Sequence, residues 1–108
     1  KIKLTYLVIN EVYQIVGPFS FERIDHHIPN DIKNNIVENC KEGKYTSFGK
    51  YDVSRTETTD GFKFFFDDDT WLMIRPSGTE PVLRTYAESS SKEKCFDILE
   101  ETRKTLLD

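Results

Sequence analysis

The chain has 108 residues and a formal net charge of −4, and 37% of its residues are hydrophobic and 31% charged. This length suits one domain with a real apolar core, and the composition excludes a disordered chain. The acidic balance argues against a protein that grips nucleic acid by its phosphates, because such proteins carry a basic surplus. No apolar run approaches the roughly 20 residues that a membrane-spanning helix needs.

The first part of the sequence predicts a helix followed by an extended segment. Apolar residues recur at helical spacing over residues 4–16, and Gly17 with Pro18 supplies a stop signal. Residues 19–28 then alternate, imperfectly, between apolar and polar side chains, which is typical of a strand.

A second, short helix is predicted after Pro29. The Pro-Asn-Asp sequence there is typical of a helix start. The apolar residues that follow share one helical face and are Ile32, Ile36, Val37 and Cys40. Gly43 stands where a C-capping glycine is expected.

Residues 46–87 have a β pattern. Tyr51, Val53 and the threonines after them indicate one strand, and Asp60-Gly61 is a strong hairpin signal.

Three more strands follow this hairpin signal. Residues 62–66 place phenylalanine at every second position, residues 71–74 are apolar, and residues 82–87 form the last strand. A polar break at residues 67–70 and a loop around residues 75–81 separate the three.

The C-terminal helix has the clearest pattern. Ser90 and Glu93 have the spacing of a capping box. The predicted inner stripe consists of Cys95, Phe96, Leu99, Thr102 and Leu106. The charged residues expected largely on the solvent side are Glu100, Glu101, Arg103 and Lys104.

Together these elements predict one α+β domain over residues 1–108. The order is β-α-β-β-β-β-α with an extra N-terminal helix in front. Short strands joined by tight turns imply a mostly antiparallel sheet of four to five strands with helices packed on one face.

The cysteines and the start of the chain bear on its cellular context. Cys40 and Cys95 fall at apolar positions of predicted helices, and no Cys/His cluster with zinc spacing is present. We therefore expect two buried thiols and a cytoplasmic protein, with a disulfide between them as the alternative. The sequence starts at Lys1 and its single methionine is Met73, so we expect a piece of a longer or trimmed chain.

The loop of residues 75–81, Arg-Pro-Ser-Gly-Thr-Glu-Pro, has more hydrogen-bond donors than a hairpin needs. As chemistry it is a phosphate clasp, because the Arg75 guanidinium matches phosphate oxygens and Ser77 and Thr79 offer hydroxyls. Gly78 lets a ligand approach its N–H and can take the positive φ of an anion-binding nest. On residue types alone, an ordinary turn is slightly favoured over a clasp.

The sequence around this loop resembles the last domain of the α-D-phosphohexomutases, the phosphoglucomutase/phosphomannomutase family. The resemblance rests on the run WLMIRPSGTEP at residues 71–81 and LRTYAE at residues 83–88. The seven-residue loop matches the family's phosphate-binding loop without a substitution. The resemblance is strong over residues 57–108 and mostly one of pattern before them.

This resemblance implies a TATA-binding-protein-like fold for a domain that swings over the cleft of a four-domain enzyme. The loop would hold the phosphate of a phosphohexose that is not being transferred. The residues expected to contact it are Arg75, Ser77, Gly78 and Thr79. Glu80 has the wrong charge for that contact and is expected to orient an arginine or a backbone group.

The resemblance also implies what this chain lacks. The phosphoserine that transfers the phosphoryl group, the Mg²⁺ ion and the sugar-reading loop belong to other domains of the parent enzyme, and no segment here matches their motifs. We therefore expect no catalytic residue, metal ligand or cofactor in this chain, and no activity from it alone. Its expected partners are the phosphohexose and the other domains, with no nucleic acid or membrane.

Several other residues have a plain structural interpretation beside a functional one. Arg84 either adds charge to the clasp or is a paired surface residue. The acidic run 67–69 lacks the wider ligand spacing of a Ca²⁺ loop and predicts a solvated turn. His26 and His27 are expected at the surface, and Trp71 with the alternating phenylalanines is expected in the core rather than stacked on bases.

Two other functions remain open at this point. A nucleic-acid-binding module shares the implied fold, although fold does not carry function and the net charge of −4 counts against it. A structural or interaction domain that has lost its ligand is the third, and the intact loop speaks against it. A salt-dependent response to DNA would support the nucleic-acid-binding module. A phosphosugar titration of the complete protein without any response would support the structural or interaction domain.

Overall fold

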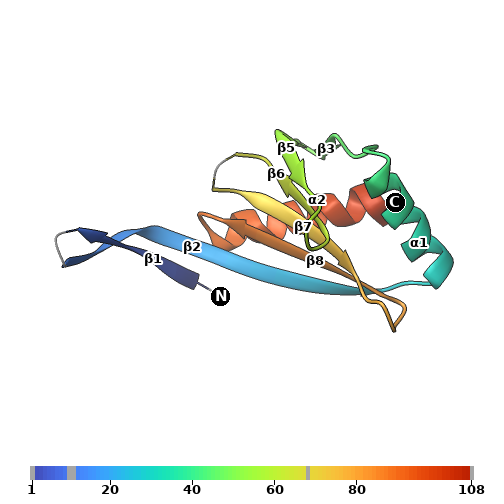
Figure 1. Ribbon diagram of the computed structural model, residues 1–108, viewed down its shortest axis with the longest axis horizontal. Coiled ribbons are helices and arrows are strands. Elements are labelled where there is room, and N and C mark those ends of the chain that lie inside the picture. The colour runs from blue at the N-terminus through green and yellow to red at the C-terminus, as the bar shows by residue number, and fades with distance from the viewer. Residues whose placement is uncertain (1, 10–11, 68, 108) are drawn as a thin grey trace.

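An antiparallel sheet of six strands forms the body of the protein (Figure 1). The computed structural model describes residues 2–9, 12–67 and 69–107. The strands in spatial order are β1 (Ile2–Ile9), β2 (Val12–His27), β8 (Val82–Ser89), β7 (Trp71–Pro76), β6 (Phe62–Phe65) and β5 (Arg55–Glu57). Each strand is antiparallel to its neighbour.

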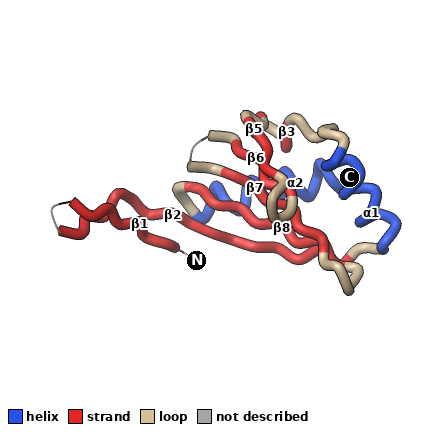
Figure 2. The backbone as a smooth tube through the Cα atoms, in the orientation of Figure 1, coloured by secondary structure: helices blue, strands red, loops and turns tan. Residues whose placement is uncertain are grey.

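Two helices and a small hairpin complete the described part of the chain (Figure 2). The helices are α1 (Asn30–Lys41) and α2 (Lys92–Leu107). The hairpin pairs β3 (Ser47–Phe48) with β4 (Tyr51–Asp52). Among the residues described, neither helix has the length and apolar character needed to cross a membrane. The predicted α+β class, the antiparallel sheet and the helices on one face are confirmed, whereas the sheet has one strand more than expected.

The predicted N-terminal helix is wrong, because residues 4–16 belong to β1 and β2 apart from 10–11, which lie outside the described residues. Gly17 and Pro18 end no element, since β2 continues to His27. The segment is rich in valine, isoleucine and tyrosine, which favour strands. A short apolar run fits the period of a helix and that of a strand equally well. Pairing with a neighbouring strand decides between them, and the periodicity of the sequence does not report that pairing.

Most other elements lie where the sequence predicts them. Residues 19–28 are extended through β2, and residues 62–66, 71–74 and 82–87 coincide with β6, β7 and β8 within about two residues. The Asp60-Gly61 signal marks the hairpin between β5 and β6. The strand predicted around Tyr51 is split into the short β4 and β5.

Helix α1 ends at the predicted glycine. Gly43 has a φ of 70°, and its N–H donates to the carbonyl of Cys40 at 3.2 Å. The N–H of Lys44 donates to the carbonyl of Asn39 at 3.0 Å. This pair of bonds is a Schellman closure, which satisfies carbonyls that the end of a helix leaves free.

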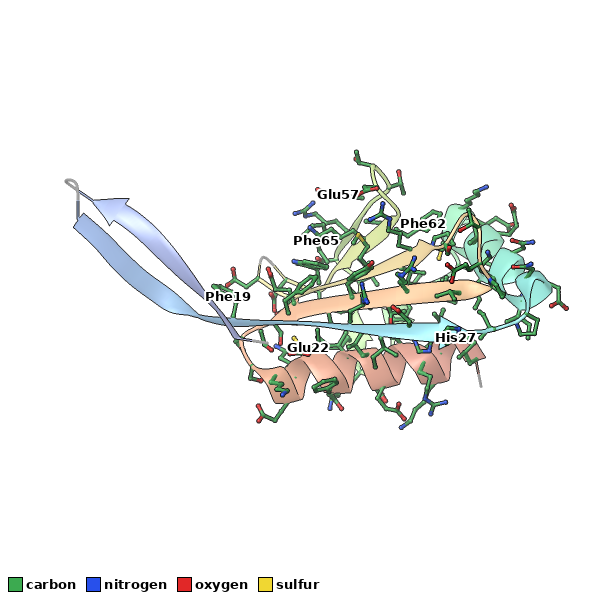
Figure 3. All side chains as sticks on the ribbon, turned by 90° about the horizontal axis from the view of Figure 1, so that it is seen from below. Phe19, Glu22, His27, Glu57, Phe62 and Phe65 are labelled. Atoms are coloured by element: carbon green, nitrogen blue, oxygen red, sulfur yellow. The ribbon has the colours of Figure 1, made fainter. Side chains whose placement is uncertain are left out.

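The core lies between the sheet and the helices. It consists of Ile36, Cys40, Phe48, Phe64, Leu72, Ile74, Leu83, Ala87, Cys95, Ile98 and Leu99. Helix α2 runs along β2 and β8 on one side of the sheet, with Glu57 and Phe65 far from it (Figure 3). Phe48 brings the small hairpin into this core, with its ring 5.0 Å from that of Phe64. In the part of the chain that the structure describes, no helix packs on the opposite face of the sheet (Figure 3).

Helix α2 begins one residue later than the predicted cap. The hydroxyl of Ser91, not that of Ser90, accepts a hydrogen bond from the N–H of Lys94 at 3.1 Å. Glu93 is therefore one position short of the capping-box site. The capping residue type was predicted correctly, and three consecutive serines made its register ambiguous.

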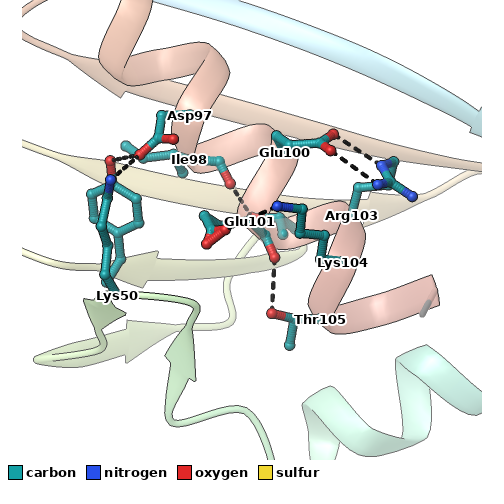
Figure 4. Close-up of polar contacts among 10 residues, drawn as sticks. Lys50, Asp97, Ile98, Glu100, Glu101, Arg103, Lys104 and Thr105 are labelled. Carbon is teal, nitrogen blue, oxygen red and sulfur yellow. Dashed lines mark hydrogen bonds and ion pairs between the residues drawn. The ribbon is translucent and has the colours of Figure 1, made fainter.

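The buried stripe of α2 is Cys95, Leu99 and Thr102, as predicted, together with Ile98, which the prediction missed. Phe96 is 42% exposed instead of buried. Neighbouring residues lie about 100° apart around a helix, so Cys95 and Phe96 cannot both be central. The outer side carries ion pairs, such as Arg103 with Glu100 (Figure 4).

Both cysteines are buried thiols, not a disulfide. Burial raises the pKa of Cys40 to about 12. The sulfur of Cys95 lies 3.1 Å from the carbonyl oxygen of Ser20 and 3.2 Å from the hydroxyl of Ser89. Cys40 is therefore a poor nucleophile, and both cysteines are buried at positions typical of structural thiols.

Trp71 lies on the open face of the sheet and not in the core that the helices cover. Its ring centroid is 5.9 Å from that of Phe21, and its Nε1 donates to the Glu88 carboxylate at 3.3 Å. The ammonium of Lys63 stands 4.2 Å from the ring. Of the predicted phenylalanine stripe, Phe64 is fully in the core, and the other two members pack against it half-buried.

His26 is half-buried, not a surface residue, whereas His27 is exposed as predicted. His26 Nε2 lies within hydrogen-bond distance of Thr85 Oγ1, at 3.1 Å, and the Thr85 hydroxyl also lies 3.4 Å from the carbonyl oxygen of Ile24. Burial lowers the pKa of His26, and the nearby charge of Arg103 lowers it further.

Candidate functional site

The loop between β7 and β8 lies at a corner of the sheet, beside helix α1 (Figure 1). Two backbone hydrogen bonds close its base. The N–H of Ser77 donates to the carbonyl of Val82 at 3.0 Å. The N–H of Ile28, just past β2, donates to the carbonyl of Pro81 at 3.1 Å. The loop is thus fixed at both ends while its tip is exposed.

Inside the loop, backbone N–H groups converge on one oxygen. The hydroxyl of Ser77 accepts from the N–H of Glu80 at 3.2 Å and from that of Thr79 at 3.4 Å. Successive amides that point to one spot form an anion-binding concavity. Ser77 Oγ therefore occupies the place that an anion oxygen could take, and Gly78, Thr79 and Glu80 are all exposed beside it.

Gly78 does not have the positive φ expected of it. Among the glycines of the described ranges, positive φ is found at Gly43, Gly49 and Gly61. A Cβ atom added at Gly78 would meet nothing within 4 Å. The fold itself therefore does not require glycine at this position, and the space over its backbone is open to a ligand.

Two arginines face each other on the open side of the sheet, next to the loop. Arg75 on β7 and Arg84 on β8 are direct cross-strand partners. Like charges placed opposite each other destabilise a strand pair. The compensation here is weak, because Asp60 lies 3.6 Å from Arg75 and Asp25 lies 3.8 Å from Arg84. Exposed ion pairs of this kind contribute about 1 kcal/mol or less, so an arriving anion can replace them.

Lys33 on α1 belongs to this site, and the sequence did not reveal it. Its ammonium donates to the carbonyl of Ser77 at 2.9 Å and to that of Glu80 at 3.0 Å. The residue is only 8% exposed. The signal that could have found it is its helical spacing, since it shares the face of Ile36 and Cys40.

The side chain of Glu80 has a smaller part than expected. Within the described ranges its carboxylate makes no hydrogen bond or ion pair, and only its backbone joins the loop contacts. The expected orienting role therefore has no contact to support it.

The described residues include no group of three or more His, Cys, Asp or Glu side chains placed to hold a metal ion. The magnesium ion that the resemblance implies for the parent enzyme has no matching donor set among these residues.

Comparison with known proteins gives one consistent result. The family model described as phosphoglucomutase/phosphomannomutase, C-terminal domain, matches residues 31–105. A protein named phosphoglucomutase/phosphomannomutase from Thermococcus kodakarensis is 48% identical over 46 residues, which is 43% of this chain and 10% of that protein.

Two longer matches carry the name probable phosphoglucosamine mutase. The one from Methanothermobacter thermautotrophicus is 36% identical over 75 residues, 69% of this chain and 16% of its own length. The one from Pyrococcus abyssi is 34% identical over 80 residues, 74% of this chain and 17% of its own length. The chain thus spans less than a fifth of these relatives. The residues matched by the family model include the β7–β8 loop, Arg84 and Lys33.

Proposed function

Because this chain belongs to the C-terminal domains of the phosphoglucomutase/phosphomannomutase family, we propose that its β7–β8 loop binds the phosphate of a phosphohexose that is not being transferred. The observation that carries this proposal is that three kinds of group able to bind a phosphate lie together at the corner of the sheet between β7 and β8. These are the converging amides of the loop, the hydroxyls of Ser77 and Thr79, and the opposed pair Arg75 and Arg84.

Each group has a distinct part in the proposed site. The Arg75 guanidinium donates to two phosphate oxygens, because its planar fork matches their geometry. The hydroxyls of Ser77 and Thr79 and the N–H of Gly78 donate to the remaining oxygens. The N–H groups of Thr79 and Glu80, which donate to Ser77 Oγ without ligand, would donate to a phosphate oxygen instead. The Ser77 hydroxyl would then donate to the same phosphate. Arg84 adds positive charge beside Arg75.

A clasp of this composition reads a phosphate group and not a sugar. It is therefore indifferent to which end of the hexose carries the phosphate that it holds. A mutase needs this property, because its substrate must bind in two orientations, with the 1-phosphate or the 6-phosphate held. The energy of holding the remote phosphate positions the other end of the sugar for transfer.

The reactive groups of the parent enzyme lie elsewhere in this proposal. A phosphoserine on another domain donates and regains the phosphoryl group, and magnesium is held beside it. The present chain supplies binding and orientation, and it excludes water if it closes over the cleft. We therefore expect no turnover from this chain alone and only millimolar phosphate affinity.

A ¹⁵N-HSQC titration tests the proposal with glucose 1-phosphate, glucose 6-phosphate and unphosphorylated glucose. The two phosphates should shift the amides of residues 75–80 with similar dissociation constants, and glucose should shift none. Dissociation constants that differ more than about tenfold, or equal shifts with glucose, would contradict an orientation-blind phosphate clasp. No response to either phosphate would favour an interaction domain without a ligand.

A further inference from the structure

Lys33 is a buried lysine whose ammonium pairs with no carboxylate among the described residues. The residue is 8% exposed, and no ion pair to it is present among the described residues. Its only hydrogen-bond partners there are the carbonyl oxygens of Ser77 and Glu80. Burying a charge is costly unless it is paired and hydrogen-bonded, so an uncompensated lysine needs a reason.

The two carbonyls that Lys33 holds set the direction of the loop's peptide groups. Because the N–H of a trans peptide points opposite to its C=O, holding the Ser77 carbonyl toward α1 directs the N–H of Gly78 away from Lys33. The Glu80 carbonyl shares its peptide group with Pro81, which has no N–H, so the second bond anchors the end of the loop. The N–H groups of Thr79 and Glu80, which belong to the two peptide groups between these anchored ones, meet at Ser77 Oγ. The same cation thus anchors the peptide groups on both sides of these two amides and places a positive charge next to the loop.

Lys33 reaches the loop from a different part of the chain. The two bonds join residues 44 and 47 positions apart in the sequence. A plain turn has no need of such a tie, because its polar groups can satisfy one another. The exposed lysine of the same helix, Lys41, lies instead 3.7 Å from Glu38 at the surface.

We propose that Lys33 is a positioning residue of the phosphate site, whose ammonium orders the backbone of residues 77–80 and supplies the charge that a bound phosphate neutralises. This inference rests on the proposed function of the loop. A merely structural lysine would stabilise the fold without changing how the loop binds an anion.

The test compares three variants of this chain with the wild type. Lys33→Met removes the charge and the donors at similar length, and Lys33→Arg keeps both. Lys41→Met is the matched control, because it makes the same change on the exposed side of the same helix. Thermal unfolding reports whether each variant folds, ¹⁵N relaxation reports the order of residues 77–80 without ligand, and titration with inorganic phosphate gives the dissociation constant.

We expect Lys33→Met to weaken phosphate binding by about tenfold or more and to lower the order of the Gly78, Thr79 and Glu80 amides. Lys33→Arg should recover most of the affinity, and Lys41→Met should match the wild type. If Lys33→Met does not fold, Lys33→Gln, which keeps two donors without the charge, takes its place.

Unchanged affinity together with unchanged loop order in a folded Lys33→Met variant would overturn the proposal. A wild type that does not respond to phosphate would instead refute the proposed function. In that case ¹⁵N relaxation without ligand still tests the positioning role of Lys33. Unchanged order of residues 77–80 in Lys33→Met would reject this role, and lowered order would support it.

Discussion

The two connections at the ends of β7 differ in how their backbones are held. The β6–β7 turn closes on itself. The Asp67 carboxylate accepts the N–H of Asp69 at 2.9 Å, and the carbonyl of Thr70 accepts the N–H of Phe66 at 2.9 Å. These groups lie within a few residues of one another. The exposed Asp67 and Asp69 therefore lie in the solvated turn that the sequence predicted, and Asp68 lies outside the described residues.

The β7–β8 loop is held from outside. Lys33 comes from α1 and Ile28 from the end of β2, and both bond to loop carbonyls. At its tip Gly78, Thr79 and Glu80 are exposed, and the amides of Thr79 and Glu80 bond to the Ser77 hydroxyl of the same loop. The same kinds of turn residue thus form a connection closed by its own residues and one anchored by residues from α1 and the end of β2, and the second arrangement supports the binding role that we propose for the β7–β8 loop.

The largest expected difference between the two connections comes from replacing Arg75, at the start of the β7–β8 loop. Arg75→Ala removes a charge-assisted contact to phosphate, so we expect affinity to fall by about 10- to 100-fold. The free energy of unfolding should change by about 1 kcal/mol or less, since its ion pair with Asp60 is exposed. Titration and urea unfolding measure the two effects.

The matched control for this variant is Arg55→Ala, which removes an exposed arginine from the edge strand β5, where it packs 3.7 Å from the Phe65 ring. Equal affinity losses in the two variants would mean that only net charge matters and not the loop.

Two glycines sharpen the distinction between a structural turn and a binding loop. Gly61 has a φ of 101°, and an added Cβ would lie 3.0 Å from the carbonyl oxygen of Ile74. Gly61→Ala should therefore lower the free energy of unfolding by about 1–3 kcal/mol. Gly78→Ala should leave stability within about 0.5 kcal/mol and weaken phosphate binding, because the methyl group occupies open space over the loop. Urea unfolding and phosphate titration measure the two effects. A large loss of stability in Gly78→Ala, or a loss of phosphate affinity in Gly61→Ala alone, would contradict the distinction between a structural turn and a binding loop.

Ser77 in the β7–β8 loop and Asp67 in the β6–β7 turn allow a comparison with smaller expected effects on phosphate binding and on stability. Ser77→Ala should cost about 1 kcal/mol of phosphate binding, the net value of one hydrogen bond. Asp67→Ala should cost about 1 kcal/mol of folding free energy for the same reason and leave phosphate binding unchanged. An effect of Asp67→Ala on phosphate affinity would show that the two connections do not act separately.

The smallest expected effect is a pH dependence of the β6–β7 turn. Partial burial acts to raise the pKa of the Asp67 carboxyl, but hydrogen bonds from Asp69 and Thr70 outweigh it and lower the pKa. A carboxyl with a lowered folded-state pKa stabilises the fold above its unfolded value of about 3.9, and this is lost as pH falls through the folded value.

We therefore expect Asp67→Asn to be less stable than the wild type near pH 6 and equal to it at strongly acidic pH. Urea unfolding at several pH values measures this, and parallel curves for the two proteins would contradict it.

Local signals in the sequence were enough for much of the fold. The Asp60-Gly61 turn, the Gly43 cap and the alternation along β6 each depend on residues close together in the chain. The β1–β2 hairpin was missed because residues 4–16 fit a helix and a strand alike, and the pairing that decides is not local. The position of Phe96 was missed because the stripe was wrong by one step around the helix.

The site was predictable to a different extent. Arg75 and Ser77 were proposed as phosphate contacts through the resemblance of their loop, since their residue types alone slightly favoured an ordinary turn, and this stays a prediction. Lys33 was not found, because its partners lie 44 and 47 residues away and a lysine in a helix is ordinarily a surface residue. The facing of Arg75 and Arg84 likewise depends on strand register.

The most direct test of the central claim is a crystal structure of this chain with inorganic phosphate at a concentration that saturates the titration. We predict a phosphate at the tip of the β7–β8 loop, within hydrogen-bond distance of the Arg75 guanidinium and of the N–H of Gly78 or Thr79. The Ser77 hydroxyl should have turned from those amides toward the phosphate. A phosphate ordered elsewhere on the molecule, with this loop unchanged and without ligand, would contradict the account.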